Sequence, residues 1–282
     1  MSSLRVEPLP DVRALIGEGP LWEESEQTLL FVDIMGKKIH RWSSASNQIA
    51  SLDTGEAPRP VGFAVAAQGG GYVAGVGRSF SSVDWSTGAV TSLVTVDDDK
   101  PQNRLNDGKV DPTGRLFAGT MGLEQSPGQV QMKQGALFSL DSELKLQKLL
   151  DQYLERLDWS SDGKLFFYVD SLEKSVDVLI MTSGPETSVR TIYYSVLIVR
   201  IGPPDGLTLD SDGNIWVSCY DGGRVLKLHP QTGTSAKFDS RVFRCAAADR
   251  LSAQPLAGAT FRVSGLGVKG RPPVEFSGTV LK

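Results

Sequence analysis

Histidine and cysteine are scarce in this chain of 282 residues, which contains two of each. The two cysteines, Cys219 and Cys245, are too few for a disulfide scaffold and fit a reducing compartment. The two histidines, His40 and His229, exclude a three-histidine zinc site and an HExxH motif, and we interpret both as strand-end or surface residues. Any bound metal is therefore expected to have oxygen ligands, which calcium, magnesium and manganese prefer.

A surplus of basic residues and long apolar runs are also lacking. The chain has 29 lysines and arginines against 33 aspartates and glutamates, a balance that argues against a nucleic-acid partner. The first residues contain no apolar stretch of the about 7–15 residues that a secretory signal needs, and no run approaches the roughly 18 residues of a membrane span. We expect a monomeric cytoplasmic protein with no membrane partner and no nucleic-acid partner.

The sequence does contain a repeat, in which a polar or acidic residue and a turn are followed by an apolar strand. The first apolar residues of its five copies are 43, 44, 49 and 50 positions apart, and they are Leu29, Tyr72, Leu116, Leu165 and Ile215. A four-stranded propeller blade has about 40–50 residues. The repeat therefore predicts an all-β fold, a six-bladed β-propeller in which residues 1–282 form a single domain.

The last of the six blades is predicted to be incomplete. One strand is expected at residues 258–263, where another copy of the repeat should begin. The preceding residues 239–255 lack the alternation of a strand and indicate a loop or a short helix.

Two motif-like segments are interpreted as ordinary turns. Residues 265–270 match GxGxxG, but no acidic residue stands about 20 positions further on, so a turn and a strand are favoured over a dinucleotide site. The run Asp97–Asp99 lacks the later glycine and glutamate of an EF-hand loop and is interpreted as a solvated turn.

Three polar segments combine carboxylates or amides with turn-forming residues. Glu18 lies between two glycines, and Asp205 follows two prolines and precedes a glycine. Arg104, Asn106 and Asp107 stand together in one turn-like segment. Each segment also fits a plain turn, but corresponding loops of successive blades converge at one end of a propeller channel. Glu18 and Asp205 are therefore expected to face that channel, where converging oxygens would make a site for a hard cation.

At these segments the sequence resembles the senescence marker protein and gluconolactonase family, over nearly the whole chain. The resemblance is most specific in residues 106–112, Asn-Asp-Gly-Lys-Val-Asp-Pro, and in residues 117–121, Phe-Ala-Gly-Thr-Met. Further matching segments are residues 17–22, 30–34, 103–105, 157–160, 204–206, 216–220, 222–225 and 265–270.

The resemblance implies a fold, a cofactor and an activity. Members of the family are six-bladed propellers that hold one divalent cation (Ca, Zn, Mn or Mg) in the channel and hydrolyse small-molecule sugar lactones, and a calcium-binding regulatory role is also described. Carried over residue by residue, the resemblance implies that Glu18 and Asp205 are metal ligands and that Asp205 is also the base. It further implies that Arg104, Asn106 and Glu124 contact the sugar.

The third metal ligand is where this chain departs from the family pattern. The family has Ser-Asn-Gly before Leu-Asp-Trp, and its asparagine binds the metal, whereas this chain has Leu154-Glu155-Arg156 there. Glu155 then stands in the ligand position, and its carboxylate suits a hard cation. Arg156 either compensates the added negative charge or blocks the space of the glycine. The last blade also lacks about one strand pair of the family pattern.

These observations favour a divalent-metal-dependent sugar lactone hydrolase. In that hypothesis the cation polarises the lactone carbonyl, and Asp205 takes a proton from the attacking water. The alternative is a calcium-binding regulatory protein with weak or no lactonase activity. A poorly folded variant that does neither is the third hypothesis.

Overall fold

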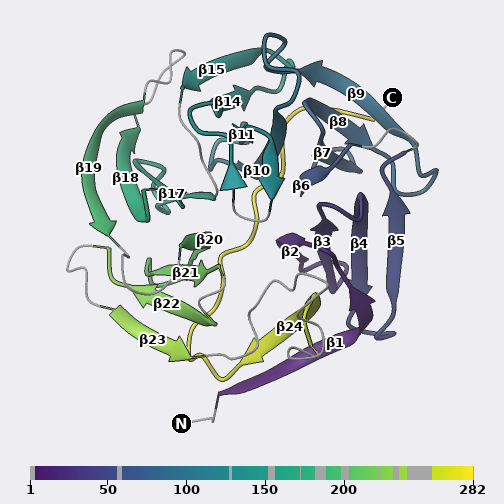
Figure 1. Ribbon diagram of the computed structural model, residues 1–282. Coiled ribbons are helices and arrows are strands. Elements are labelled where there is room, and N and C mark those ends of the chain that lie inside the picture. Colours follow the sequence, from purple (N-terminus) through teal and green to yellow (C-terminus); the bar gives the residue numbers. More distant parts are fainter. Residues whose placement is uncertain are drawn as a thin grey trace.

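The architecture is an all-β propeller, as the repeat predicts. The computed structural model describes residues 4–55, 59–126, 129–151, 156–171, 173–181, 189–197, 203–220, 223–230, 235–239 and 256–281. Five four-stranded antiparallel sheets, the blades, stand around a common axis with the first strand of each nearest that axis (Figure 1). All the regular elements in the described ranges are strands, so these ranges contain no helix that could cross a membrane.

Each blade is built from strands that follow one another in the chain. Blade 1 contains β2 (Gly17–Glu23), β3 (Thr28–Asp33), β4 (Lys38–Ser43) and β5 (Ile49–Asp53). Blade 2 contains β6 (Val61–Ala66), β7 (Tyr72–Val76), β8 (Ser79–Val83) and β9 (Val90–Thr95). Blade 3 contains β10 (Arg104–Val110), β11 (Leu116–Met121), β14 (Leu137–Leu140) and β15 (Leu146–Leu150). A separate hairpin of β12 (Glu124–Ser126) and β13 (Gln129–Val130) is inserted between β11 and β14. Blade 4 contains β16 (Leu157–Trp159), β17 (Leu165–Asp170), β18 (Ser175–Met181) and β19 (Val189–Leu197). Blade 5 contains β20 (Pro204–Leu209), β21 (Ile215–Cys219), β22 (Arg224–Leu228) and β23 (Ser235–Asp239).

The repeat detected in the sequence forms the second strand of every blade. Its copies correspond to β3, β7, β11, β17 and β21. The strands β3, β7, β11 and β17 are nearly continuous buried runs, as expected of strands covered on both faces. In β21, by contrast, buried and half-buried residues alternate. Every residue of β7 and β11 is buried, whereas β9 at the rim of blade 2 has no buried residue.

The hydrophobic core lies between the blades. Side chains of β3 pack against those of β6 and β7, which joins blade 1 to blade 2. Three further clusters join blades 2 and 3, blades 3 and 4, and blades 4 and 5 in the same way. Because each fully buried apolar side chain contributes about 1.5–3 kcal/mol, these interfaces hold the ring together.

Besides the five blades, the described residues form a two-stranded sheet of β1 (Arg5–Arg13) and β24 (Ala259–Ser264). This sheet lies between blade 5 and blade 1 (Figure 1). The strands are antiparallel, and Val6 is paired with Val263. The strand expected at residues 258–263 is thus confirmed. Residues 240–255 lie outside the described ranges, and the count of six blades stays a prediction.

Three interpretations of local sequence were wrong. The turn-like segment of Arg104, Asn106 and Asp107 belongs to strand β10 and carries a β-bulge. His40 is only 4% exposed within β4, where its Nδ1 lies 2.7 Å from Ser51 Oγ. Asp97 is 7% exposed rather than solvated, whereas Asp98 and Asp99 form the exposed turn that the sequence predicts. His40 and Asp97 can be buried because each has a hydrogen-bond partner. For Asp97 this partner is the side-chain amide of Asn103, whose Nδ2 donates to Oδ2 at 2.6 Å.

The segment after β24 crosses the ring and ties several blades together (Figure 1). Residues 265–270 form the expected turn, but without a strand apart from an isolated bridge between Gly270 and Asp210. Further on, the amide of Phe276 donates to the carbonyl of Ala66, and that of Ser277 donates to the carbonyl of Gly114. These contacts lie where the inner strands end, so the segment crosses the end of the ring opposite to their starts.

Candidate functional site

Four of the five innermost strands leave the regular ladder close to their starts. The register shifts lie between Glu18 and Leu21 in β2, Val61 and Ala64 in β6, Leu105 and Gly108 in β10, and Pro204 and Leu207 in β20. A β-bulge turns side chains out of the normal alternation and is a common way to re-aim them beside a functional site. The predicted site residues Glu18, Asn106 and Asp205 all lie at these shifts.

Three charged side chains from different blades meet here and are called the central cluster: Glu18, Asp107 and Arg156. The Nε of Arg156 lies 3.0 Å from Oδ2 of Asp107, and its Nη1 lies 3.4 Å from Oε2 of Glu18. The side chains are 24% exposed for Glu18, 11% for Asp107 and 16% for Arg156. The fold of the ring thus brings together Glu18 from β2, Asp107 from β10 and Arg156, the residue directly before β16.

The cluster shifts the pKa values of its own members. Burial raises the pKa of Asp107 to about 6, with the charge of Glu18 adding to the rise and that of Arg156 opposing it. Burial alone would lower the pKa of Arg156, but the carboxylates of Asp107, Glu18 and Asp205 outweigh it and raise that pKa. The site therefore combines a permanent cation with a carboxyl that titrates close to neutral pH, a combination typical of functional sites.

The predicted metal ligands are only partly described. Glu18 contacts Arg156 directly, and the charge of Asp205, like that of Asp158, helps to raise the pKa of this arginine. Glu155 lies outside the described ranges, and the ligand set Glu18, Glu155 and Asp205 stays a prediction. Within those ranges no group of three histidine, cysteine, aspartate or glutamate side chains is arranged to hold a metal ion. The structure places a guanidinium beside Glu18.

The predicted sugar contacts lie at one end of blade 3. Nη1 of Arg104 donates to Oδ1 of Asn106 at 2.7 Å, and Asn106 is 6% exposed. Arg104 is paired with Met121, the last residue of β11. Glu124 follows in the β12–β13 hairpin, so it projects from the same end of the blade. Their contact with a sugar stays a prediction.

Two members of the central cluster, Asp107 and Arg156, are absent from the predicted set of site residues. The signal for Asp107 is its position before Gly108, a pair that fits a plain turn as well as a β-bulge. The signal for Arg156 is that it stands where the family pattern has a glycine. Neither signal says which other side chain the residue meets, because their partners are far away in the chain.

Gly62 allows β6 to lie directly against the strand that carries Asp107. A Cβ atom at Gly62 would lie 2.0 Å from the carbonyl oxygen of Asn106. Replacing Gly62 with alanine is therefore expected to lower the free energy of unfolding by about 1–3 kcal/mol, because the two strands must move apart. Urea unfolding measures the change. Gly270→Ala is the control, since an added Cβ there meets nothing within 4 Å, and equal stability of the two variants would contradict the prediction.

Asp107 gives the stability a dependence on pH. Its pKa is about 6 in the folded protein against an ordinary 3.8. A carboxyl whose pKa is raised by folding contributes stability that is present below the unfolded value and is lost as the pH rises through the folded value. The stability of the natural chain relative to Asp107→Asn is therefore expected to fall by roughly 1–3 kcal/mol between about pH 4 and about pH 6.5.

This prediction is checked by urea unfolding of both proteins over that pH range. The shape of the difference is the result, because the packing that the variant changes does not depend on pH, whereas the charge of Asp107 and its attraction to Arg156 appear only as the carboxyl ionises. A difference that does not change with pH would show that the pKa of Asp107 is not raised by folding.

A second buried network surrounds Asp158 in β16, whose side chain is 3% exposed. Its carboxylate lies 2.7 Å from Nζ of Lys109 and 2.7 Å from Nη2 of Arg271, and it accepts the amide of Leu209 at 2.9 Å. Burial alone would raise the pKa of Asp158, but the two cations outweigh it and hold that pKa below its ordinary value. The network joins blade 4 to blades 3 and 5 and to the segment that crosses the ring.

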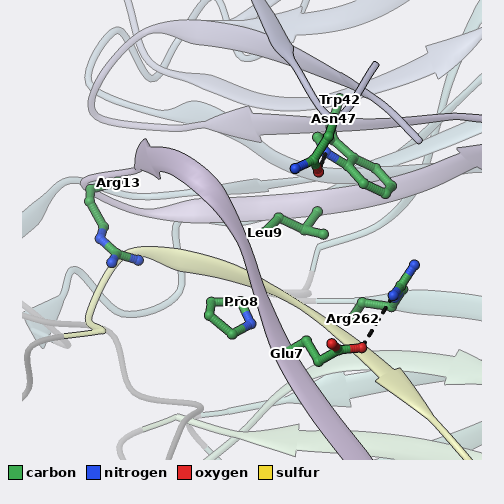
Figure 2. A pocket seen from close by; sticks show the side chains of 7 residues that line it. All are labelled: Glu7, Pro8, Leu9, Arg13, Trp42, Asn47 and Arg262. Atoms are coloured by element: carbon green, nitrogen blue, oxygen red, sulfur yellow. Dashed lines mark hydrogen bonds and ion pairs between the residues drawn. The ribbon is translucent and has the colours of Figure 1, made fainter. Parts of the chain in front are cut away.

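A surface pocket of about 430 Å³ lies between blade 1 and the two-stranded sheet, and its lining residues are Glu7, Pro8, Leu9, Arg13, Trp42, Asn47 and Arg262 (Figure 2). The dashed line in Figure 2 is the ion pair of Arg262 with Glu7, in which Nη2 and Oε2 are 3.2 Å apart. The pocket shares no residue with the central cluster or with the predicted site.

Comparisons with known proteins agree on one family. Residues 16–246 match the SMP-30/Gluconolactonase/LRE-like region. Regucalcin of Xenopus laevis is 40% identical to this chain, in an alignment that covers 99% of this chain and 100% of the relative. That alignment runs over 304 positions against the 282 residues of this chain, so the relative contains residues that this chain lacks.

Two solved structures share the fold of this chain. A luciferin-regenerating enzyme has a TM-score of 0.86 and 26% identity, and the match covers 98% of this chain and 100% of the enzyme. A gluconolactonase of Xanthomonas campestris has a TM-score of 0.71 and 20% identity, and the match covers 92% of this chain and 89% of the gluconolactonase. At this identity the match shows a shared fold. From the family match and the identity to regucalcin, we conclude that this chain belongs to the SMP-30/gluconolactonase/LRE-like family.

Proposed function

We propose that this chain hydrolyses the ester bond of a sugar lactone. The family match and the 40% identity to a regucalcin over nearly the whole chain support this proposal. The observation that carries it is the central cluster, in which three blades bring a guanidinium and two carboxylates together at the bulged ends of the inner strands. The charge of a third carboxylate, that of Asp205, helps to raise the pKa of the guanidinium.

Lactone hydrolysis requires a base for the attacking water and donors that hold the sugar. We assign the base to Asp205, which takes a proton while the water oxygen bonds to the carbonyl carbon. As the tetrahedral intermediate collapses, the ester carbon–oxygen bond breaks and the ring oxygen leaves as a hydroxyl with that proton. The new carboxyl releases its own proton to solvent. Arg104, Asn106 and Glu124 hold the sugar hydroxyls in this proposal.

A divalent cation is the group that the family resemblance implies at this site. Its proposed ligands are Glu18, Glu155 and Asp205, and when bound there it would act as a Lewis acid toward the lactone carbonyl. The structure pairs Glu18 with Arg156, which also contacts Asp107. A divalent cation placed beside this guanidinium would be repelled by its positive charge. The described residues therefore do not fit a resident divalent cation while Arg156 stands in the cluster.

The proposed activity is tested by following proton release from gluconolactone and subtracting the spontaneous rate. The assay is run after treatment with a chelator and again with added calcium, zinc, manganese or magnesium. We expect hydrolysis above the spontaneous rate and in proportion to protein concentration. No such rate under any condition would overturn the proposal, and calcium binding without turnover would then favour the calcium-binding regulatory protein.

A further inference from the structure

We propose that Arg156 is the built-in cation of this site, and that it takes the place and the electrostatic role of a divalent metal ion. The catalytic half of this inference rests on the proposed lactone hydrolysis. Its other half, that the site binds no divalent cation, concerns the chain alone and is tested separately.

The backbone fixes where the guanidinium stands. The carbonyl of Arg156 accepts the amide of Val169 at 2.9 Å, which places the residue next to β17 directly before Leu157 begins β16. Leu157 is fully buried between blades 3 and 4. The Arg156 side chain itself is 16% exposed and reaches both Asp107 and Glu18.

The charges around Arg156 are those expected of a cation site. Asp107 and Glu18 contact it directly at 3.0 and 3.4 Å, and Asp205 acts on it as a third negative charge. A carboxylate as buried as that of Asp107 is costly without a partner. The other nearby cation, Lys109, already forms a 2.7 Å ion pair with Asp158. Moving Arg156 away to admit a metal would therefore leave Asp107 without a contact to a cation among the described residues.

The guanidinium also has the donors that the reaction needs. Its contacts to Asp107 and Glu18 use Nε and Nη1, and no described residue is bonded to Nη2. An arginine has five N–H groups in a rigid plane, which match a carboxylate or a developing oxyanion. When water adds to the lactone carbonyl, the carbonyl π electrons move to oxygen, and an N–H of Arg156 donates to that oxygen. Arg156 keeps its proton throughout, so Asp205 still carries the proton from the water to the leaving ring oxygen.

Calcium titration calorimetry tests the metal half of the inference on the intact chain. We expect no binding of calcium to the natural chain. Arg156→Ala removes the guanidinium that repels a cation from Glu18 and Asp107, and it is expected to bind one calcium with a Kd of about 10⁻⁵–10⁻³ M. Adding Glu18→Gln to that variant should abolish the binding. Arg41→Ala is the matched control, because it removes a similarly buried arginine from a carboxylate, Glu23, 2.9 Å away in blade 1.

The lactonase assay tests the catalytic half. Treatment with a chelator is expected to change the rate of the natural chain and of Arg41→Ala by less than about twofold. In Arg156→Ala the rate is expected to fall about 10–1,000-fold without metal, as for the loss of an oxyanion donor, and to rise again when calcium is added.

Two results would overturn the inference. One is binding of calcium by the natural chain with a stoichiometry of one that Glu18→Gln abolishes, and this test stands even where Arg156→Ala does not fold. The other is loss of the lactonase rate of the natural chain on chelation. If no protein hydrolyses the lactone, the proposed function fails, whereas the calcium titrations still decide whether Arg156 occupies the cation position.

Discussion

Replacing Asp158 with asparagine is expected to lower the free energy of unfolding by about 3–5 kcal/mol, the typical cost of removing one partner from a buried ion pair. The variant keeps the shape of the side chain but leaves Lys109 and Arg271, each 2.7 Å from the carboxylate, without their counter-charge. It also weakens the link between blade 4, blade 5 and the segment that crosses the ring. Urea unfolding at neutral pH measures the loss.

The pH dependence of this loss has a definite sign. Because Lys109 and Arg271 hold the pKa of Asp158 below its ordinary value despite burial, its stabilising effect is present above the unfolded pKa and is lost as the pH falls through the folded pKa. The natural chain and Asp158→Asn should therefore approach each other in stability under acidic conditions. Asp162→Asn in the same blade is the control, since its exposed pair with Lys164 spans 3.7 Å and contributes about 0–1 kcal/mol. Equal losses in the two variants would contradict a structural role for the Asp158 network.

Replacing Asp205 with asparagine is expected to reduce kcat for gluconolactone by about 10²–10⁴-fold, the usual contribution of a general base. The amide is nearly isosteric with the carboxylate but does not accept the proton of the attacking water. We expect KM and the urea midpoint to change little, because Asp205 lies at the bulge of β20 rather than in a core cluster.

The matched control for Asp205 is Asp212→Asn, which changes an exposed aspartate in the turn between β20 and β21 of the same blade. It should hydrolyse the lactone at the rate of the natural chain. If Asp205→Asn keeps its rate within about threefold of this control, Asp205 is not the base, and Asp107 becomes the candidate because its pKa of about 6 also suits proton transfer.

The fold was predictable from the sequence where burial is strongest. Tyr72 and Leu116 begin second strands in which every residue is buried, so packing requires apolar runs at a regular spacing. His40 and Asp97 were misjudged because a polar side chain in a strand or a turn looks the same whether or not another strand covers it. Their burial depends on partners, Ser51 and Asn103, that local pattern does not reveal.

The site was predictable only in part for a related reason. Glu18 and Asp205 stand out because each is held by glycine or proline at the start of an inner strand. The structure places Glu18 3.4 Å from Arg156, and the charge of Asp205 helps to raise the pKa of that arginine. The sequence leaves open whether Arg156 compensates charge or blocks space. The added charge is that of Glu155, which lies outside the described ranges. What the structure adds is that the guanidinium contacts Glu18 across 138 positions of sequence. A contact over that distance is created by the ring and not by any local motif.

The pairing of β1 with β24 also determines when the molecule can be completed during its synthesis. Glu7 and Arg262, which face each other across this sheet, are 255 positions apart. The five blades are made of sequence neighbours and can form while the chain is still growing on the ribosome, whereas β1 has no partner until almost the last residues have been translated. Until then it is an open strand edge, to which another nascent chain can add. Translation that stops before β24 thus yields an aggregation-prone chain with its blades already formed.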